Sequence, residues 1–419
     1  MANKELWGLT LLERNLKQLD GLGFEKAIVL IAEGNAPRKH FFHPLPKTLE
    51  TTFVKANHSD PFESLRNNLQ ENNHPVLVLE GHGLYDKRVL TKLITGGNSL
   101  AVLSPHERPS ASSAVVHNSD AELFGQNPPG KLTHVLKQAV HASKIPNLDL
   151  SNVETYIKNL RAHLAPFLLL IEKSEHLEKA DRLLRRAVHK GVNDFVAKYI
   201  HPPLEFAGTR LLAPTPVTPN QVTLLGIVLS ILTVYLFSTG RLLAGAILAA
   251  IKGVLDGIDG KLARLTLRFS KYGDLLDHIG DTIFDGLWYV ALGWHFSGGD
   301  VGSTAGQFGI ILLISYIVCR IVPGVFHKLH GTEIYDYQKI DRAIRLVGGR
   351  INNNIWVFLI GVILGFGREA FYTISFWMLL TAVWYTMRLF YVTIKRKMKR
   401  IEPLALTTET TESDIKQHA

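Results

Sequence analysis

The apolar C-terminal half of the chain, from Val222 onward, is the feature that most constrains its fold. Six apolar segments follow one another there, near 222–238, 242–260, 273–294, 305–323, 353–366 and 370–393. A helix of about 20 apolar residues is long enough to cross a bilayer. Helices satisfy their own backbone hydrogen bonds, as lipid requires. We therefore predict an all-α domain of six transmembrane helices.

Lys and Arg are distributed unevenly between the connecting segments. They gather at 261–271, 320–350 and 395–400, whereas the opposite loops carry only Arg241 and Arg368. Cationic loops are retained on the cytoplasmic side of a membrane. We therefore expect a multi-pass protein of the cell (inner) membrane, with the N-terminal region and the C-terminus in the cytoplasm.

The N-terminal half has a different pattern, in which short apolar runs alternate with amphipathic stretches. Predicted strands are 26–32, 75–79 and 99–103, and predicted helices lie near 9–21, 62–72, 86–95 and 131–142. This alternation favours a three-layer α/β domain with a mostly parallel sheet. Residues 109–130, rich in Ser, Asn, Pro and Gly, predict an irregular surface loop.

Residues 152–200 between the halves look helical and charged. The stretch 177–200 has helical periodicity, and predicts either a linker helix packed on the soluble domain or an amphipathic helix on an anionic leaflet. Its place before the first span slightly favours the second. The predicted domains are 1–150 (α/β), 151–215 (helical linker and juxtamembrane helix), 216–400 (six spans) and 401–419 (disordered tail).

Composition excludes several classes of protein. One cysteine, Cys319, rules out a disulfide framework and a Cys-rich zinc site. The net charge of +9 is shared between the two halves, so we predict no nucleic-acid partner. The start, MANKELWGLTLLERN, has no basic run followed by an apolar run, so we expect no secretory signal.

The segment 256–281, DGIDGKLARLTLRFSKYGDLLDHIGD, places carboxylates at predicted membrane depth. Its first helix face carries Asp256, Asp259, Gly260, Ala263 and Arg264, and its second carries Gly273, Asp277 and Asp281. A single Asp could simply mark a helix end. Four converging carboxylates repel one another and are costly to desolvate unless a cation binds them. Oxygen ligands without His or Cys suit Mg²⁺ or Mn²⁺.

The pattern D-x2-D-G-x2-A-R-x8-G-x3-D-x3-D resembles the signature of the CDP-alcohol phosphotransferase (CDP-alcohol phosphatidyltransferase) family without a departure. These integral membrane enzymes move a substituted phosphate from a CDP-linked donor to an alcohol and release CMP. The resemblance covers about 210–394. It implies a two-metal site of Mg²⁺ or Mn²⁺, membrane lipid as surroundings, a role in polar-lipid biosynthesis and a homodimer.

The resemblance also implies roles for individual residues. Asp256, Asp259, Asp277 and Asp281 would form the metal site, with Asp281 as the general base. The donor would contact Gly260, Ala263, Arg264, Gly273, Asn220 and Thr223. Lys252 and Arg320 are candidates for the acceptor because their spans should bury them, although membrane-anchoring cations are an alternative. Asp285 continues the i+4 series. It could support the metal ligands from behind, but we favour a side chain that is solvated or bonded to Ser or Thr.

The N-terminal region faintly resembles nucleotidyltransferases fused to such enzymes in inositol-phosphate cytidylyltransferase proteins. Only MANKELWGLT precedes the first predicted helix, and Glu80-Gly81-His82 stands where the family has a metal-binding Asp. We therefore expect this domain to be inactive. One alternative is a bifunctional enzyme that also makes its own CDP-inositol or a similar donor. Another is a cation transporter that uses the Asp cluster, although transport does not require Arg264.

Overall fold

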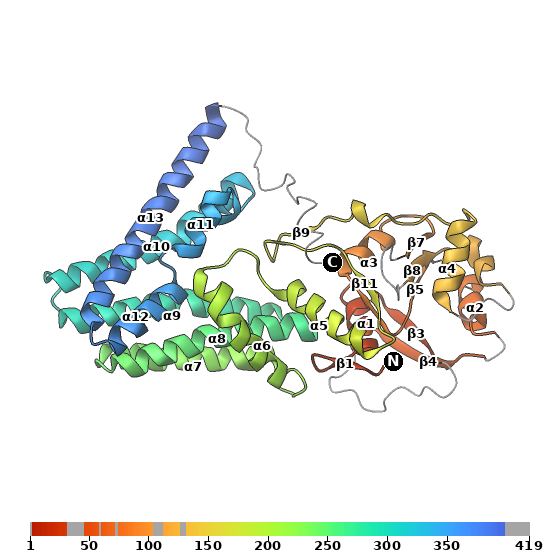
Figure 1. The fold of residues 1–419 in the computed structure, drawn as a ribbon, viewed down its shortest axis with the longest axis horizontal. Helices are drawn as coiled ribbons and strands as arrows, with labels where there is room; N and C mark the ends of the chain where they lie inside the picture. Colours follow the sequence, from red (N-terminus) through yellow and green to blue (C-terminus); the bar gives the residue numbers. More distant parts are fainter. Residues whose placement is uncertain are drawn as a thin grey trace. The chain divides into compact units, whose positions relative to one another are not determined.

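The computed structural model describes residues 2–31, 46–57, 60–71, 74–103, 112–125 and 131–398 (Figure 1). Within these ranges, the side chains of four residues are not described: Lys271, Asp274, Asp277 and Met398. The chain forms two compact units. The first contains Met1–His189, Thr209–Val217 and Lys261–Arg268, and the second contains Lys190–Gly208, Thr218–Gly260 and the described chain from Phe269 onward.

The N-terminal region is a mixture of short strands and helices. The strands are β1 (Glu5–Leu6), β2 (Leu9–Thr10), β3 (Lys26–Ile31), β4 (Glu50–Lys55), β5 (Val76–Leu79), β6 (Gly83–Tyr85), β7 (Leu100–Leu103), β8 (Ser112–Val116), β9 (Tyr156–Ile157), β10 (Ala162–His163) and β11 (Leu168–Leu170). The helices are α1 (Leu11–Asp20), α2 (Glu63–Glu71), α3 (Lys87–Ile94), α4 (Leu132–His141) and α5 (Ser174–Val188), with 3-10 turns η1 (Asn118–Phe124) and η2 (Leu150–Asn152). The three predicted strands and four predicted helices are confirmed.

The predicted mostly parallel sheet is wrong for the described strands. β3 and β4 are parallel, but β8 lies between β5 and β7 and is antiparallel to both. The sequence prediction missed β8 because it lies within 109–130, where Ser and Asn suggested an irregular loop. All five residues of β8 are buried. Its small Ser and Ala side chains fit between the layers, and a strand buried on both faces lacks the alternation that marks a half-exposed strand.

Helices cover both faces of this three-stranded sheet. Ala101 and Ala114 pack in a cluster with residues of α2 and α4, whereas Val102 and Val115 pack in a cluster with residues of α3. Successive residues of a strand point to opposite faces, so each strand contributes to both clusters. The region is therefore mixed α/β, with helical layers on either side of its central sheet.

The predicted helical stretch 152–200 is wrong in two places. Its first part contains β9, β10 and β11, and β11 pairs with β6. The second part divides at 189–194 into α5 and a π-helical turn, η3 (Val196–Ile200). Gly191 lies in this break, where a glycine lowers helix stability.

The first unit joins three segments that are distant in the sequence. Trp7 is 7% exposed, and the guanidinium carbons of Arg185 and Arg210 lie 5.2 Å and 5.0 Å from its ring centroid. The Arg14 guanidinium donates hydrogen bonds to the carbonyl oxygens of Leu6, at 3.1 Å, and Leu265, at 2.7 Å. Burial lowers the pKa of Arg14 to about 10, which still leaves it charged at neutral pH. The N-terminal residues therefore pack against the end of the segment that carries the Asp signature.

The second unit is helical. Its elements are η3, α6 (His201–Leu212), α7 (Pro219–Ser238), α8 (Leu242–Thr266), α9 (Lys271–Ser297), α10 (Thr304–His330), the 3-10 turn η4 (Ile334–Asp336), α11 (Lys339–Val347), α12 (Ile351–Ile363) and α13 (Gly367–Met398). The last residues of α6 and α8 belong to the first unit. The six apolar segments named above are helical as predicted, except that α12 ends at Ile363 and residues 364–366 form a turn. The predicted tail 401–419 lies outside the described residues.

Among the described helices, four regions are long and apolar enough to span a membrane. They are Pro219–Ser238, Thr304–His330, Lys339–Ile363 and Gly367–Lys397. α8 and α9, with 25 and 27 residues, are also long enough to span a membrane, but both carry several ionisable side chains. Charges at membrane depth are costly, so these helices need partners for their polar groups. The chain is thus a multi-pass membrane protein with four candidate spans.

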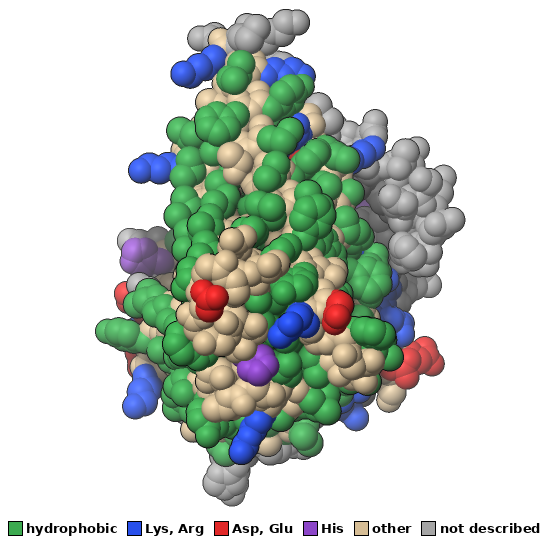
Figure 2. Space-filling model, turned by 90° about the vertical axis from the view of Figure 1, so that its left-hand side faces the viewer, with side chains coloured by type: hydrophobic (Ala, Val, Ile, Leu, Met, Phe, Trp, Pro, Cys, Tyr) green, Lys and Arg blue, Asp and Glu red, His purple; other side chains and the backbone are tan. Residues whose placement is uncertain are grey.

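The surface of the helical region is strongly apolar. Figure 2 shows hydrophobic side chains over most of the face that it presents, with few charges among them. Large exposed apolar residues recur along α7, α10 and α13: Leu224, Leu225, Val228, Ile231, Ile310, Ile314, Ile317, Ile321, Phe376, Leu380, Val383 and Met387. Exposed apolar area of this extent marks a surface that contacts lipid or protein rather than water.

Candidate functional site

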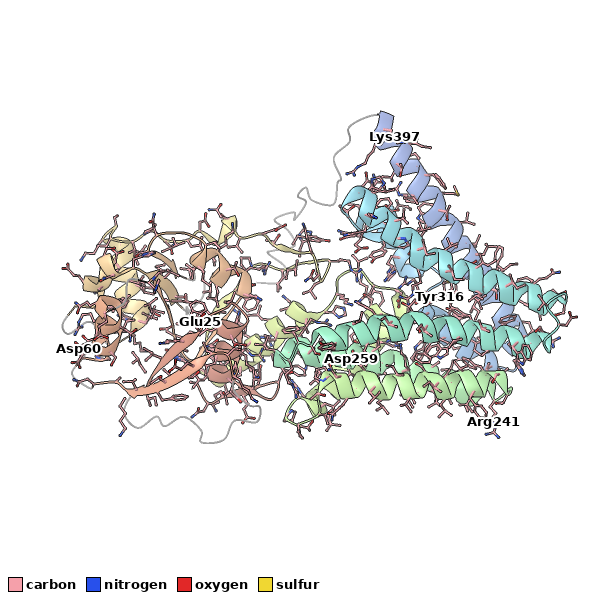
Figure 3. The ribbon with its side chains drawn as sticks, turned by 180° about the vertical axis from the view of Figure 1, so that it is seen from behind. Glu25, Asp60, Arg241, Asp259, Tyr316 and Lys397 are labelled. Carbon is pink, nitrogen blue, oxygen red and sulfur yellow. The ribbon has the colours of Figure 1, made fainter. Side chains whose placement is uncertain are left out.

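A small cavity lies between α7, α8 and α9 and brings three of the predicted carboxylates together. Its volume is about 10 Å³, which is space for roughly one water-sized group. The lining residues are Val222, Thr223, Gly226, Ile227, Ser230, Lys252, Asp256, Asp259, Gly280, Asp281 and Phe284. Figure 3 shows Asp259 far from Arg241, which lies in the turn between α7 and α8. Carboxylates from two helices therefore face one enclosed space.

Asp259 is the most deeply held of the three carboxylates. It is 6% exposed and accepts a hydrogen bond of 2.6 Å from the Thr223 hydroxyl. Thr223 is itself fixed on α7, because its hydroxyl is also 3.2 Å from the Pro219 carbonyl. α7 begins where it does because Thr218 caps it and Pro219 occupies its first turn. Thr223, predicted as a donor contact, thus orients Asp259 in this structure.

Asp256 and Asp281 are more accessible than Asp259. Asp256 is exposed, and Asp281 is half-buried and forms a short ion pair with the Lys252 ammonium. The side chain of Asp277 lies outside the described residues, although its backbone belongs to α9. Among the described side chains, no three His, Cys, Asp or Glu are already close enough to hold a metal ion. The donor set nevertheless fits a hard cation, because all the candidate ligands are carboxylate oxygens.

Asn220 and Gly273, both predicted at the donor, lie against each other. A Cβ on Gly273 would lie only 2.1 Å from the Asn220 Oδ1 atom, so glycine is needed for this approach. The Asn220 amide also donates to the Ser270 hydroxyl at 3.3 Å, and Ser270 caps α9. These contacts set the distance between the starts of α7 and α9.

Gly260, Ala263 and Arg264 follow the two aspartates along α8. Gly260 belongs to the second unit, whereas Ala263 and Arg264 belong to the residues grouped with the first. Helix periodicity places Gly260, Ala263 and Arg264 within about one turn of one another on the face of Asp256. Their predicted contacts with a nucleotide stay predictions.

The two acceptor candidates are both ion-paired with aspartates of α9. Arg320 donates to Asp285 at 2.9 Å and to the Tyr316 hydroxyl at 3.0 Å. Lys252 pairs with Asp281, and its Nζ lies 3.9 Å from the Asp285 Oδ1 atom. Asp285 is 2% exposed, so our expectation of a solvated or Ser/Thr-bonded side chain is wrong. Two cations take the place of water as its partners: Lys252 of α8, which is buried as expected, and Arg320 of α10, whose side chain is 36% exposed, so that the expected burial is wrong for Arg320.

Sequence analysis missed a buried polar pair behind the signature. His201 and Glu205 of α6 are 1% and 4% exposed, and the Trp356 indole donates to His201 Nε2 at 3.0 Å. A Cβ on Gly257 would lie 1.9 Å from a Glu205 carboxylate oxygen. Gly257 stands between the two aspartates of α8, so Glu205 packs directly against the back of the site. The signal was available, since His and Glu with i,i+4 spacing stand out before the first span.

We expect Gly257→Ala to destabilise the protein by about 1–3 kcal/mol, because Glu205 is buried and has little room to move. Thermal unfolding in detergent would measure the loss. Gly324→Ala is a matched control, because a Cβ there meets nothing within 4 Å in another helix of the same unit. Equal unfolding midpoints for the two variants would contradict the close contact.

The place predicted for a metal-binding Asp in the N-terminal region is occupied by Glu80, at the end of β5. Its carboxylate accepts hydrogen bonds from the Thr133 hydroxyl at 2.8 Å and the Ser112 amide at 3.3 Å. Burial raises the pKa of Glu80, and these hydrogen bonds oppose the rise. Glu80 thus connects β5, β8 and α4, which is a structural role.

Long apolar helices around a carboxylate-lined cavity define a membrane protein with a polar site. Residues 216–387 match the family described as CDP-alcohol phosphatidyltransferase. The match contains α7 to α12, most of α13 and every residue of the cavity.

Three relatives with a similar sequence are named as transferases or synthases. A bifunctional IPC transferase and DIPP synthase of Thermococcus kodakarensis is 28% identical over 191 residues, covering 45% of this chain and 42% of the relative. An archaetidylinositol phosphate synthase of Pyrococcus horikoshii is 39% identical over 93 residues, covering 22% and 49%. A phosphatidylinositol phosphate synthase of Mycobacteroides abscessus is 27% identical over 195 residues, covering 44% and 77%. The chain spans less than half the length of the first two.

A solved structure of phosphatidylinositol phosphate synthase from Mycobacterium tuberculosis, in complex with manganese and citrate, also matches. It is 19% identical, covers 50% of this chain and 92% of that chain, and has a TM-score of 0.35.

Proposed function

We propose that this protein transfers a substituted phosphate from a CDP-linked donor to an alcohol, releasing CMP, in polar-lipid biosynthesis. The observation that carries the proposal is the cavity in which Asp256, Asp259 and Asp281 meet, within the region that matches the family. Four candidate spans and an apolar surface support a substrate that resides in the membrane.

The roles proposed for the carboxylates follow from charge. Asp256, Asp259, Asp277 and Asp281 hold Mg²⁺ or Mn²⁺. When bound, such ions neutralise phosphate charge and stabilise the transition state. Thr223 orients Asp259 toward this task through its hydrogen bond. Asp281 removes the proton from the acceptor hydroxyl, which requires a carboxylate within hydrogen-bond reach of the bound alcohol.

The donor is proposed to lie along the start of α9 and the end of α8. Arg264 binds its phosphates, because a guanidinium can form paired hydrogen bonds to phosphate oxygens. Gly260 and Ala263 present little side-chain bulk to the cytidine. Asn220 and Gly273 are in mutual contact at the start of α9, so a nucleotide that reaches Asn220 also lies near Gly273.

We propose a phosphorylated polyol of the inositol phosphate class as the acceptor. Arg320 and Arg345 both lie close enough to Arg350 to interact with it electrostatically. The Nε atoms of Arg345 and Arg350 are buried without a hydrogen-bond partner. Buried cations in such a group attract an anion. The printed names of the relatives, which include inositol phosphate synthases, support the same class.

The direct test is CMP release from labelled CDP-diacylglycerol by the purified full chain, with inositol 1-phosphate, inositol or glycerol 3-phosphate as acceptor. We expect metal-dependent CMP release, greatest with inositol 1-phosphate. Cation flux in reconstituted vesicles without CMP release from any donor would favour the transporter alternative and overturn the proposal.

We expect Arg350→Gln to raise KM for the phosphorylated acceptor by about 10- to 100-fold while changing kcat less, because a charge-assisted contact is lost. Arg342→Gln is the matched control. Arg342 is paired with Asp336 at 2.6 Å and is more exposed, so its loss should leave KM nearly unchanged. A larger increase in KM for Arg342→Gln than for Arg350→Gln would contradict this placement and indicate that the acceptor binds near Arg342 of α11.

The bifunctional alternative assigns nucleotidyl transfer to the N-terminal region. We expect the full chain to release no pyrophosphate from CTP with any sugar or inositol phosphate. The acidic residue available after β5, Glu80, is engaged by Thr133 and Ser112 rather than free for a metal. Coupled pyrophosphate detection would measure this directly, and steady release above a no-acceptor control would establish the bifunctional enzyme.

The membrane arrangement completes the proposal. Six spans, in which α8 and α9 are added to the four candidate spans, cross the membrane, and both termini face the cytoplasm. The proposed domains keep the limits 1–150, 151–215, 216–400 and 401–419, and the protein acts as a homodimer.

A further inference from the structure

Lys252 is the cation that stands closest to the proposed metal ligands. It is 9% exposed and lines the same cavity as Asp256, Asp259 and Asp281. Its stem packs in the core of the unit, with the ammonium 5.9 Å from the Trp288 ring centroid. Trp288 is 1% exposed and donates to the Ser230 carbonyl at 3.1 Å, so this wall of the cavity is fixed.

The Lys252 ammonium has two carboxylates within reach. It pairs directly with Asp281 and lies 3.9 Å from Asp285 Oδ1. That Asp285 oxygen is buried and accepts no hydrogen bond, whereas Arg320 donates to the other oxygen of the same carboxylate. Asp285 therefore offers Lys252 a second position, one helical turn further along α9.

A divalent ion and the ammonium compete for Asp281. Both are positively charged, and the cavity of about 10 Å³ has space for roughly one small group. The ammonium and the metal would lie side by side at the Asp281 carboxylate, and like charges at this separation repel. Asp281 nevertheless lies beside Asp256 and Asp259 in the same cavity, so a cation is needed there when no metal is bound.

We propose that Lys252 is a built-in counter-ion of the metal site: it neutralises Asp281 when metal is absent and shifts to Asp285 when a divalent ion binds. Lys252 thereby weakens metal affinity and stabilises the metal-free protein. This is a positioning role rather than contact with the acceptor. The inference rests on the proposed function in one respect, that the carboxylates bind a divalent ion.

The test is Mn²⁺ binding to the purified full chain, measured by electron paramagnetic resonance without substrates. Lys252→Met removes the charge and keeps most of the side-chain volume. We expect its Kd for Mn²⁺ to fall by about 5- to 150-fold, the usual range for coupled binding sites. Lys328→Met removes an exposed lysine of α10 outside the cavity and should leave the Kd unchanged.

Thermal unfolding gives an independent readout. In EDTA, we expect Lys252→Met to unfold about 5 °C or more below wild type, because the half-buried Asp281 carboxylate loses the ammonium that neutralises it. Saturating Mn²⁺ should restore most of the difference. If Lys252→Met does not fold, the pair Lys252→Met with Asp281→Asn removes both charges, and it should unfold near wild type in EDTA.

Each remaining result overturns the inference. Equal Mn²⁺ affinities for wild type and Lys252→Met would overturn the proposed role of Lys252. The proposed function would still stand if the same wild-type preparation released CMP. Weaker binding in Lys252→Met would also overturn the proposed role of Lys252, because Lys252 would then support the metal ligands. An absence of Mn²⁺ binding in wild type would overturn both the inference and the metal requirement of the proposed function.

Discussion

Replacing Asp259 with Asn should lower CMP release by about 100- to 1,000-fold, because one buried charge that faces the reacting phosphates is lost. Asp259 is 6% exposed and is held by Thr223 at 2.6 Å, so the amide would remain in place but bind a divalent ion poorly. The same loss is expected for Asp277→Asn and for wild type in EDTA. Steady-state CMP release at saturating Mg²⁺ or Mn²⁺ is the measurement.

The matched control for Asp259→Asn is Asp300→Asn, in the exposed turn that joins α9 and α10. The control should retain wild-type turnover. Unfolding temperatures of both variants should stay near that of wild type, because removing one of several mutually repelling carboxylates does not weaken the fold. A wild-type rate for Asp259→Asn, or full turnover in EDTA, would count against the metal site.

Asp281→Asn should lower the turnover rate by about 10²- to 10⁴-fold, while the affinity for the donor stays largely unchanged. Asp281 lines the cavity from α9, opposite the aspartates of α8, and is half-buried. An amide in its place cannot accept a proton from the acceptor hydroxyl. Single-turnover CMP release and equilibrium binding of a CDP-linked donor would separate the two effects.

Asp281→Glu is the informative companion variant, because it keeps a carboxylate that is displaced by one methylene. We expect it to recover part of the turnover that Asp281→Asn loses. If Asp281→Asn instead loses donor affinity as far as Asp256→Asn does, then Asp281 acts mainly as a metal ligand. The Lys252 variants provide a further check, because they change metal affinity without removing the base.

The aspartates of α8 and the start of the next helix were predictable from the sequence because their signals are local. Asp256 and Asp259 share a helix face through i,i+3 spacing, and Ser270 and Thr218 cap the helices that follow. The helices around the site also follow from apolar segments of sufficient length. The spacing of the carboxylates along the sequence therefore indicates a cation site by itself.

The partners of these residues could not be predicted, because they come from distant segments. Asp285 binds Arg320 of α10, 35 residues away, and Glu205 packs on Gly257 across two helices. The central sheet was mispredicted for the same reason. β8 forms hydrogen bonds with β5 and β7. The local pattern of its Ser-rich sequence does not predict these pairings.

The sequence by itself determined the two-part organisation, the helical character of the C-terminal half and the type and spacing of the carboxylates. These properties depend on hydrophobicity and periodicity along a single segment. Only the tertiary structure decided that Lys252 pairs with Asp281 beside an unbonded Asp285 oxygen, and that Thr223 orients Asp259. Such pairings depend on how helices pack against one another, and packing is fixed by side-chain shape and charge across the whole unit.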